Sequence, residues 1–484
     1  MEYKWIALTV TTIGILMVGL DARIVIIGLP QVAQQLNADA EQAIWITQSY
    51  VLANTVMLLL IGRLGDIFGR VRIYTIGFAV FTIGSGLTSL GSNAIEVIAF
   101  RAFQGIGAAL IFTNSIAIIT DTAPKRQLGF FLGINQIAFR AGAMLGLTVS
   151  GVILSFLDWR ALFYINIPIG IVGTLWSRKA LKETALLDKN AKIDWFGFVT
   201  FTGFLLCLMI ALTFSAYGTR DLTTLYSLFA ASIVFLGIFA FWENRVKSPL
   251  VDLRLFRIRE VTGGVVSMLF NIISWTAVLL LLSLQFQLLL GETPLEAGLR
   301  ILPFELAFLA FGPASGTLAD KFRPAPFIIT GLSLSTVSLF LLSTTTQTTS
   351  YAILSLYMVM LGFGTGLFVA PNLRAMLGAV PINRRGIGSA LFTLFLNIGF
   401  TVSLNLAVAI MALTVPYNLI TNIISTANPT SITAADKILF ANGLKTTYLF
   451  LGIINAIAIA PALLQISRKP KPKQVAGPIV SGEG

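Results

Sequence analysis

Two charged residues stand two positions apart in the first apolar run of the chain. The stretch GLDARIVIIGLP, residues 19–30, contains Asp21 and Arg23 within a segment that is otherwise oily from about Trp5 onward. At the centre of a bilayer a charge costs roughly 2.5–3.5 kcal/mol on the insertion scale, and such residues usually mark a functional site. The pair therefore raises the question of what chemistry it serves.

Three more charged residues, Arg101, Arg140 and Glu305, lie well inside apolar runs. The chain has no histidine and a single cysteine, Cys207, which itself lies in an apolar run. Histidine-based catalysis, disulfides and thiolate metal sites are thereby excluded. Any proton transfer must use carboxylates. We expect neither a cofactor nor an enzymatic activity.

The composition indicates that these charges lie in a membrane. Of 484 residues, 56% are hydrophobic and 11% are charged, and the mean hydropathy is +0.86. Soluble domains carry about 25% charged residues. Apolar runs of about 20 residues recur along the whole chain, and each is long enough to cross about 30 Å of hydrocarbon. The sequence therefore predicts an all-α polytopic membrane protein.

Fourteen such runs can be delimited. They cover residues 5–28, 42–62, 73–92, 94–119, 128–154, 161–177, 195–217, 222–243, 261–290, 297–318, 325–343, 351–372, 386–414 and 445–466. The first run is too long for the apolar region of a signal peptide and lacks a small-residue cleavage site. An even number of spans places both termini on one side of the membrane.

The distribution of basic residues predicts which side that is. With both termini in the cytoplasm, 25 of the 33 lysine and arginine residues fall in inner segments, five in outer segments and three inside spans. This asymmetry follows the positive-inside rule. It accounts for the formal net charge of +12 without nucleic acid, and the basic inner loops are expected to meet anionic lipid headgroups. We expect a multi-pass protein of a cell membrane, namely a prokaryotic inner membrane.

The chain also contains an internal repeat. GRLGDIFGRVR, residues 62–72, follows the second span, and the related GTLADKFRP, residues 316–324, follows the second span of a later block. Transporters are commonly built from such repeated halves. The predicted organisation is a six-helix bundle (1–178), linkers with two inserted and peripheral helices (179–260), a second six-helix bundle (261–466) and a disordered tail (467–484).

Several motifs together resemble the major facilitator superfamily, specifically its fourteen-helix drug:proton antiporter branch. The resemblance spans nearly the whole chain and rests on LDARIVIIGLP, GRLGDIFGRVR, RAFQGIGAA, DWRALFYINIPIG, GFGTGLFVAP and VPINRRG. It implies a 6+2+6 helical fold, a proton-coupling role for Arg101 and an acidic position at Asp21. The loop motif would form a conformational gate, carried by Gly62, Asp66, Gly69, Arg70, Gly316 and Asp320.

The chain departs from the family pattern at a few positions. The fifth-helix motif reads GAMLGLTVSG, in which Ala143 and Leu147 replace the expected prolines and Ser150 replaces a glycine. Arg23 stands where the family usually has a small polar residue, and Arg323 replaces a glycine in the second loop motif. These departures bear on the substrate class and on strict antiport.

The intramembrane charges are expected to meet in a central site between the two bundles. Asp21 either forms a structural ion pair with an arginine or carries a proton. Glu305 is not expected to pair with a basic residue of its own span, and it is a candidate proton or substrate site. Arg23 and Arg140 either lock an acid or contact substrate. Further candidates for the cavity are Gln48, Tyr50, Asn54, Asn271, Trp275 and Asn397.

Two functions remain open from the sequence. The first is proton-coupled efflux of small amphipathic compounds by alternating access. The second is transport of a specific anionic or zwitterionic metabolite or lipid by uniport or symport, suggested by the extra arginines. The expected partners are a small-molecule substrate, protons and membrane lipids, without nucleic acid, and the protein is expected to be a monomer.

Overall fold

The computed structural model describes residues 2–465 apart from 125–126, 184–192, 218–221, 247–248, 347, 381–384, 417–418 and 421–432. The described residues form helices and connecting loops without any strand, so the all-α prediction is confirmed. The predicted tail (467–484) and the middle of the long outer loop lie outside the described residues.

The helices follow the predicted order of spans. The first half contains α1 (Tyr3–Gln35), α2 (Ala40–Phe68), α3 (Arg70–Leu90), α4 (Ala94–Thr122), α5 (Leu128–Phe156), α6 (Ala161–Tyr164) and α7 (Asn166–Ala180). The insertion contains α8 (Trp195–Tyr217) and α9 (Leu222–Glu243), followed by the short 3₁₀ helix η1 (Leu253–Arg257). The second half contains α10 (Arg259–Leu284), the π-helical turn η2 (Gln285–Leu289), α11 (Pro294–Lys321), α12 (Pro324–Ser343), α13 (Tyr351–Ala379), α14 (Arg385–Met411), α16 (Ala434–Ile457), α17 (Ile459–Ala462) and η5 (Leu463–Gln465).

Thirteen helices of the described residues are long and apolar enough to cross a membrane. The predicted span 161–177 is the exception, because it is divided at Ile165 into α6 and α7. Within hydrocarbon only a helix or a closed barrel satisfies every backbone group, which explains why the apolar runs fold as helices. Side-chain caps begin several of them: Asp39, Thr293 and Thr433 each form a capping box.

Two predicted boundaries differ from the structure. The last span begins at Ala434, eleven residues before the predicted start at residue 445, because the polar residues of the capping box at Thr433 belong to the helix. The first helix runs on past Pro30 to Gln35 rather than ending at residue 28. In both cases a polar helical turn extends beyond the apolar run.

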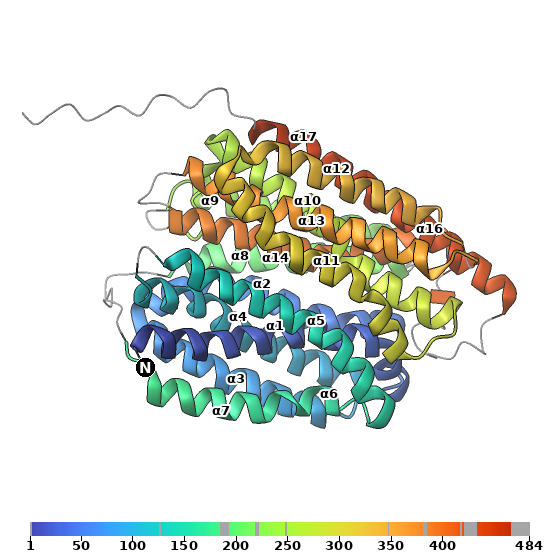
Figure 1. The fold of residues 1–484 in the computed structure, drawn as a ribbon. Helices are drawn as coiled ribbons and strands as arrows, with labels where there is room; N and C mark the ends of the chain where they lie inside the picture. The colour runs from blue at the N-terminus through green and yellow to red at the C-terminus, as the bar shows by residue number, and fades with distance from the viewer. Residues whose placement is uncertain are drawn as a thin grey trace, which may run out of the picture.

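The two halves repeat the same helix packing. In the first half α1 packs on α5, α2 on α4, and α3 on α4 and α7; in the second half α10 packs on α14, α11 on α13, and α12 on α13 and α16. Figure 1 shows the halves as two bundles side by side, with α1–α7 in one and α10–α14, α16 and α17 in the other. The order of the helices is thus 6+2+6.

The inserted helices differ in their position. Helix α9 packs mainly on α8 and is mostly exposed, as expected for a peripheral helix facing lipid. Helix α8 packs on α9 but also on α14 and α2, one helix from each half. The prediction that both inserted helices are peripheral is therefore correct for α9 and wrong for α8, which covers one flank of the contact between the bundles.

Glycines bring α1 and α5 into close contact. A side chain at Gly142 or Gly146 would collide with the backbone carbonyls of Leu16 and Leu20 on α1. Small residues at such interfaces let helices approach closely in membranes. This contact fixes Arg140 on α5 in relation to Arg23 on α1.

The two halves meet along a seam formed by α5 with α11 and by α2 with α14. At the outer end of α5, Gly151 packs against Leu295, and Gly298 packs against Leu147. Fourteen residues, about four turns, separate Leu147 from Gly133 and Gly298 from Gly312, so all four lie on the facing sides of these antiparallel helices.

The inner part of this seam is packed less closely at its glycines. No atom would lie within 4 Å of a Cβ at Gly133 or at Gly312. The contact that these faces of α5 and α11 make through glycines therefore lies at the end predicted to face outward.

Candidate functional site

Asp21 is enclosed within the first bundle by three hydrogen-bond donors. Its carboxylate accepts from Arg101 Nη1 at 2.6 Å, Gln104 Nε2 at 2.9 Å and Asn166 Nδ2 at 2.7 Å. Gln104 also donates to Ser85 Oγ at 2.6 Å. The network ties α1, α3, α4 and α7 together and is fully buried. The donors on two other helices, α4 and α7, therefore satisfy both oxygens of this carboxylate within the bundle.

Arg101 is held from several sides. It forms the ion pair with Asp21, donates to Gln104 Oε1 at 2.7 Å, and its guanidinium lies 4.2 Å from the centre of the Tyr50 ring. Only 1% of Arg101 is exposed, and Asp21 is not exposed at all. The predicted candidates Asp21, Arg101 and Tyr50 thus form one network inside the first bundle, turned away from the seam.

Arg23 and Glu305 face each other across the seam. Arg23 Nη1 lies 3.9 Å from Glu305 Oε1, which joins α1 of one half to α11 of the other. Both side chains are about nine-tenths buried or more, yet neither of these two atoms has a hydrogen-bond partner among the described residues. The pair therefore attracts electrostatically without the close hydrogen bonds that hold Asp21.

Arg140 approaches the same place from α5. Its guanidinium lies 3.5 Å from the centre of the Phe308 ring on α11, and it interacts electrostatically with Glu305 and with Arg23. Within the described part of the chain no carboxylate lies within 4 Å of Arg140. Arg23, Arg140 and Glu305, which we call the seam charges, carry a formal net charge of +1.

Aromatic rings form the wall of the site on the side of the second half. Trp275 packs with ring centres 5.4 Å from Phe304, 5.6 Å from Phe308 and 6.0 Å from Phe400. Arg23 lies over Trp275 at 5.4 Å. The indole Nε1 of Trp275 is buried and has no acceptor among the described residues.

The other predicted cavity residues divide between the seam and the bundles. Asn397 lies at the seam, because its carbonyl accepts from Thr55 Oγ1 on α2 at 3.4 Å. Gln48 is two turns before Thr55 and shares its face of α2, and its Oε1 has no partner within the described residues. Asn54 is half-buried.

Asn271 belongs to the interior of the second bundle. It donates to Asn455 Oδ1 at 2.9 Å, and Asn455 in turn donates to Leu332 O and Thr336 Oγ1. These residues lie on α10, α16 and α12, the counterparts of α1, α7 and α3. An amide network therefore occupies the place that the Asp21 network holds in the first half.

Several residues of these networks were not predicted. Gln104 lies three positions after Arg101 on the same helix face, and Phe308 three positions after Glu305, so helical spacing could have identified both. Asn166 and Ser85 come from distant helices, and no local pattern in the sequence points to them.

The predicted gate of the first half is a set of ion pairs at the inner end of the bundle. Arg70 pairs with Asp66 at 3.2 Å and with Asp121 at 2.7 Å. Gly69 adopts φ +99°, a conformation that suits glycine. At the start of α3, Glu183 accepts the backbone N–H groups of Arg70 and Val71. The cap therefore comes from the linker.

The structure gives few contacts for the other predicted gate residues. Gly62 lies within α2, and Gly316 lies near Ala370 on α13. Asp320 belongs to α11, but its side chain is outside the described residues.

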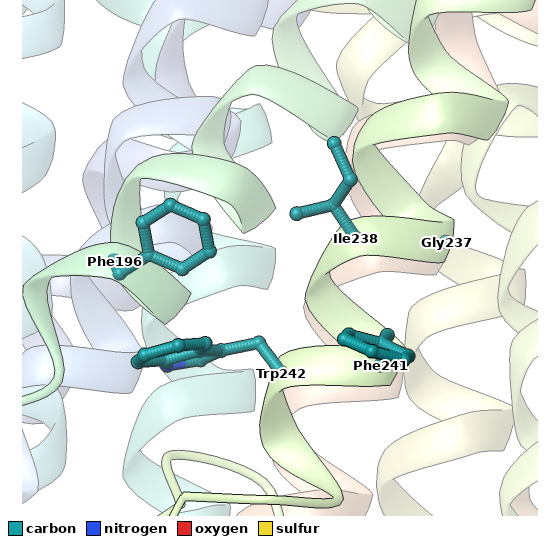
Figure 2. A pocket seen from close by; sticks show the side chains of 5 residues that line it. All are labelled: Phe196, Gly237, Ile238, Phe241 and Trp242. Atoms are coloured by element: carbon teal, nitrogen blue, oxygen red, sulfur yellow. The ribbon is translucent and has the colours of Figure 1, made fainter.

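An apolar pocket lies elsewhere, on the inserted hairpin. Figure 2 shows that Phe196 of α8 and Gly237, Ile238, Phe241 and Trp242 of α9 line it. None of the seam charges is among these residues, and the exposed rings of Phe196 and Phe241 suit contact with lipid. This pocket is separate from the candidate site.

The family model of the Major Facilitator Superfamily matches residues 11–242 and 264–480. The chain belongs to this superfamily. A riboflavin transporter, RibZ, of Clostridioides difficile is 30% identical over 86% of the chain and 90% of its own length. A tetracenomycin C resistance and export protein of Streptomyces glaucescens is 29% identical over 82% of the chain and 73% of its length.

A solved structure supports the fold. A bacterial homologue of the human lysosomal transporter Spinster, described as inward-facing and unoccupied, superposes with a TM-score of 0.69 at 15% identity and covers 96% of this chain and 97% of that one. Members of this superfamily are transporters rather than enzymes, so the chain is a multi-pass membrane transporter, consistent with a bacterial inner membrane.

Proposed function

We propose that this transporter is proton-coupled, that it moves small amphipathic compounds by alternating access at the seam, and that Glu305 carries the proton. Relatives that include an export protein support efflux as the direction. In this mechanism the halves rock about the seam charges, which lie along α5 and α11 between the outer contact of Leu147 with Gly298 and the inner glycines Gly133 and Gly312.

The observation that carries the proposal is the contrast in hydrogen bonding between the two buried carboxylates. Asp21 has three donors, whereas Glu305 Oε1 has none among the described residues. A carboxylate that makes few bonds loses little when it becomes protonated. Glu305 also lies at the seam, where an opening movement exposes it.

Transport into inverted membrane vesicles provides the test. An imposed pH gradient should drive accumulation of an amphipathic dye by the native protein. Glu305→Gln should reduce the gradient-driven part at least about tenfold, because the amide takes up no proton. Exchange of dye against dye without a gradient should persist, since it requires only alternating access.

A matched variant lies on the same helix. Glu296 is an exposed residue in the first turn of α11, and Glu296→Gln makes the same chemical change while a glutamine preserves the capping position. It should leave gradient-driven accumulation unchanged. Full gradient-driven accumulation by Glu305→Gln would remove Glu305 from the coupling role.

A second candidate function is favoured by the surplus arginine. With Glu305 ionised the seam charges sum to +1, which suits an anionic or zwitterionic metabolite or lipid better than a cation. Uniport or symport of such a solute is the corresponding mode of transport.

The direction of coupling separates the two candidates. A cation competes with the proton for Glu305, so the two solutes cross in opposite directions. An anion competes with Glu305 for the arginines, so protonation assists its binding and the two cross together. Measuring whether acidification weakens or strengthens binding of the transported compound decides between antiport and symport.

A further inference from the structure

Two buried donors at the seam lack an acceptor. Arg23 Nη1 and Trp275 Nε1 have no hydrogen-bond partner among the described residues, and Glu305 Oε1 lies 3.9 Å from Arg23 Nη1, beyond hydrogen-bonding distance. A buried donor without a partner loses its hydration without compensation. A ligand that offers additional acceptors would relieve this cost at both nitrogens.

The charge balance points to the same kind of ligand. Two guanidiniums face one carboxylate, and Arg140 has no carboxylate within 4 Å in the described part of the chain. Arginine forms its strongest contacts with planar acids, which it can hold by two parallel hydrogen bonds. An incoming carboxylate would give Arg140 the counter-ion that Glu305 supplies to Arg23.

The side chains around the two guanidiniums indicate which chemical group the carboxylate of the ligand is attached to. The guanidinium of Arg140 lies over the Phe308 ring, and that of Arg23 lies over the Trp275 ring. Trp275, Phe304 and Phe308 form a continuous aromatic wall next to both arginines. Aromatic side chains favour offset or edge contacts with further rings. A flat ring that carries the acid would therefore contact the wall while its charge reaches the arginines.

We propose that the seam binds a small aromatic acid, whose carboxylate is held between Arg140 and Arg23 and whose ring packs against Trp275 and Phe308. Arg140 is the residue that selects for negative charge. Glu305 competes with the ligand for Arg23. This inference rests on the second candidate function, because it names the class of anionic substrate for the same site.

A pair of compounds with one ring system and opposite charge provides the test. Binding of 1-naphthoate and of 1-naphthylmethylamine to the full-length protein in lipid nanodiscs is measured by calorimetry at neutral pH. The native protein should bind the acid at least about tenfold more tightly, because its charge complements the site. Equal or tighter binding of the amine would overturn the proposal.

Three variants extend this test. Arg140→Gln should remove most of the preference for the acid, and Arg140→Lys should recover part of it, because the charge returns without the planar geometry. Arg160→Gln, on the outer loop, is the matched control and should change nothing. An Arg140→Gln protein that melts normally and binds 1-naphthoate within about twofold of the native value would also overturn the proposal.

The binding of 1-naphthoate to the Glu305→Gln variant tests whether the arginines contact the ligand, because arginines with a purely structural role would not alter it. Removing the competing carboxylate should strengthen binding of 1-naphthoate by several-fold, whereas unchanged or weaker binding contradicts the competition. The outcomes remain separable from the proposed function. If a pH gradient drives accumulation of the dye but the protein does not prefer 1-naphthoate, only the inference about the substrate is refuted. If the protein prefers 1-naphthoate but a pH gradient drives no transport, only the proposed function is refuted.

Discussion

The two buried carboxylates of this transporter contrast in how completely they are satisfied. Asp21 accepts three hydrogen bonds inside one bundle, whereas Glu305 faces Arg23 across the seam at 3.9 Å without a hydrogen bond to its Oε1. Both are buried, and both oppose an arginine. Hydrogen bonding, not burial, therefore separates a charge that holds helices together from one that can exchange its partner.

The second bundle extends the comparison. Where the first half has Asp21 and Asn166, the second has Asn271 and Asn455, joined by an amide hydrogen bond. Helices α1, α3 and α7 and their counterparts α10, α12 and α16 are connected in both halves, and only the first network adds the charged Arg101 of α4. A charge is thus not needed for the connection itself, and its presence in the first half makes that bundle more sensitive to loss of a single partner.

The largest effect is expected from Asp21→Asn. This change leaves Arg101 buried without its counter-ion, which costs about 3–5 kcal/mol. The apparent melting temperature of the purified protein should fall sharply. Combining Asp21→Asn with Arg101→Gln should recover part of the loss, and an unchanged melting temperature for the single variant would show that the network does not stabilise the bundle.

Glu305→Gln should affect stability less. Among the described residues Glu305 Oε1 has no hydrogen bond that an amide would lose, so the loss should be about 1–2 kcal/mol. Thermal melts of both variants in the same detergent measure the difference directly. A cost equal to that of Asp21→Asn would contradict the distinction between the two carboxylates.

A large side chain at Gly312, in the inner part of the seam, should be tolerated in one conformation of the transporter and not in the other. Gly312→Leu fits the present arrangement but obstructs the approach of α5 when the inner end closes, so the population should shift toward the open state by about fivefold to tenfold. Spin labels at the inner ends of α5 and α11, in a Cys207→Ser background, report this distance. Gly237→Leu, which also has open space around it, is the control.

The smallest effect is expected at the other contact between the halves. Thr55 Oγ1 and Thr401 Oγ1 lie 2.9 Å apart and join α2 to α14. Thr55→Val removes this hydrogen bond while it keeps the shape of the side chain. A hydrogen bond between membrane helices contributes about 0.6 kcal/mol on average. The ratio of the two conformations, measured with the same spin labels, should therefore change by less than threefold.

Most of the fold could be predicted because hydrophobic length and charge asymmetry act on each span separately. The boundaries failed where polar turns extend a helix beyond its apolar run, as at Thr433, and where a helix breaks within a run, as at Ile165. The position of α8 could not be predicted from its lack of internal charge, because packing against α2 and α14 uses apolar side chains.

The site was predicted as a set of residue types but not as two separate groups. Side chains that are two residues apart on a helix differ in direction by about 200°, so Asp21 and Arg23 point to opposite sides of α1. That rule was available from the sequence, and it separates the network in the bundle from the seam charges. The partners contributed by distant helices, such as Asn166 for Asp21, depend on tertiary packing.

The position of α8 makes the two flanks of the contact between the bundles unlike each other. Helix α8 packs on α2 and α14 and so covers that flank, whereas within the described residues neither α8 nor α9 is among the helices that pack on α5 or α11. If the seam opens sideways toward the lipid, it is therefore expected to do so between α5 and α11.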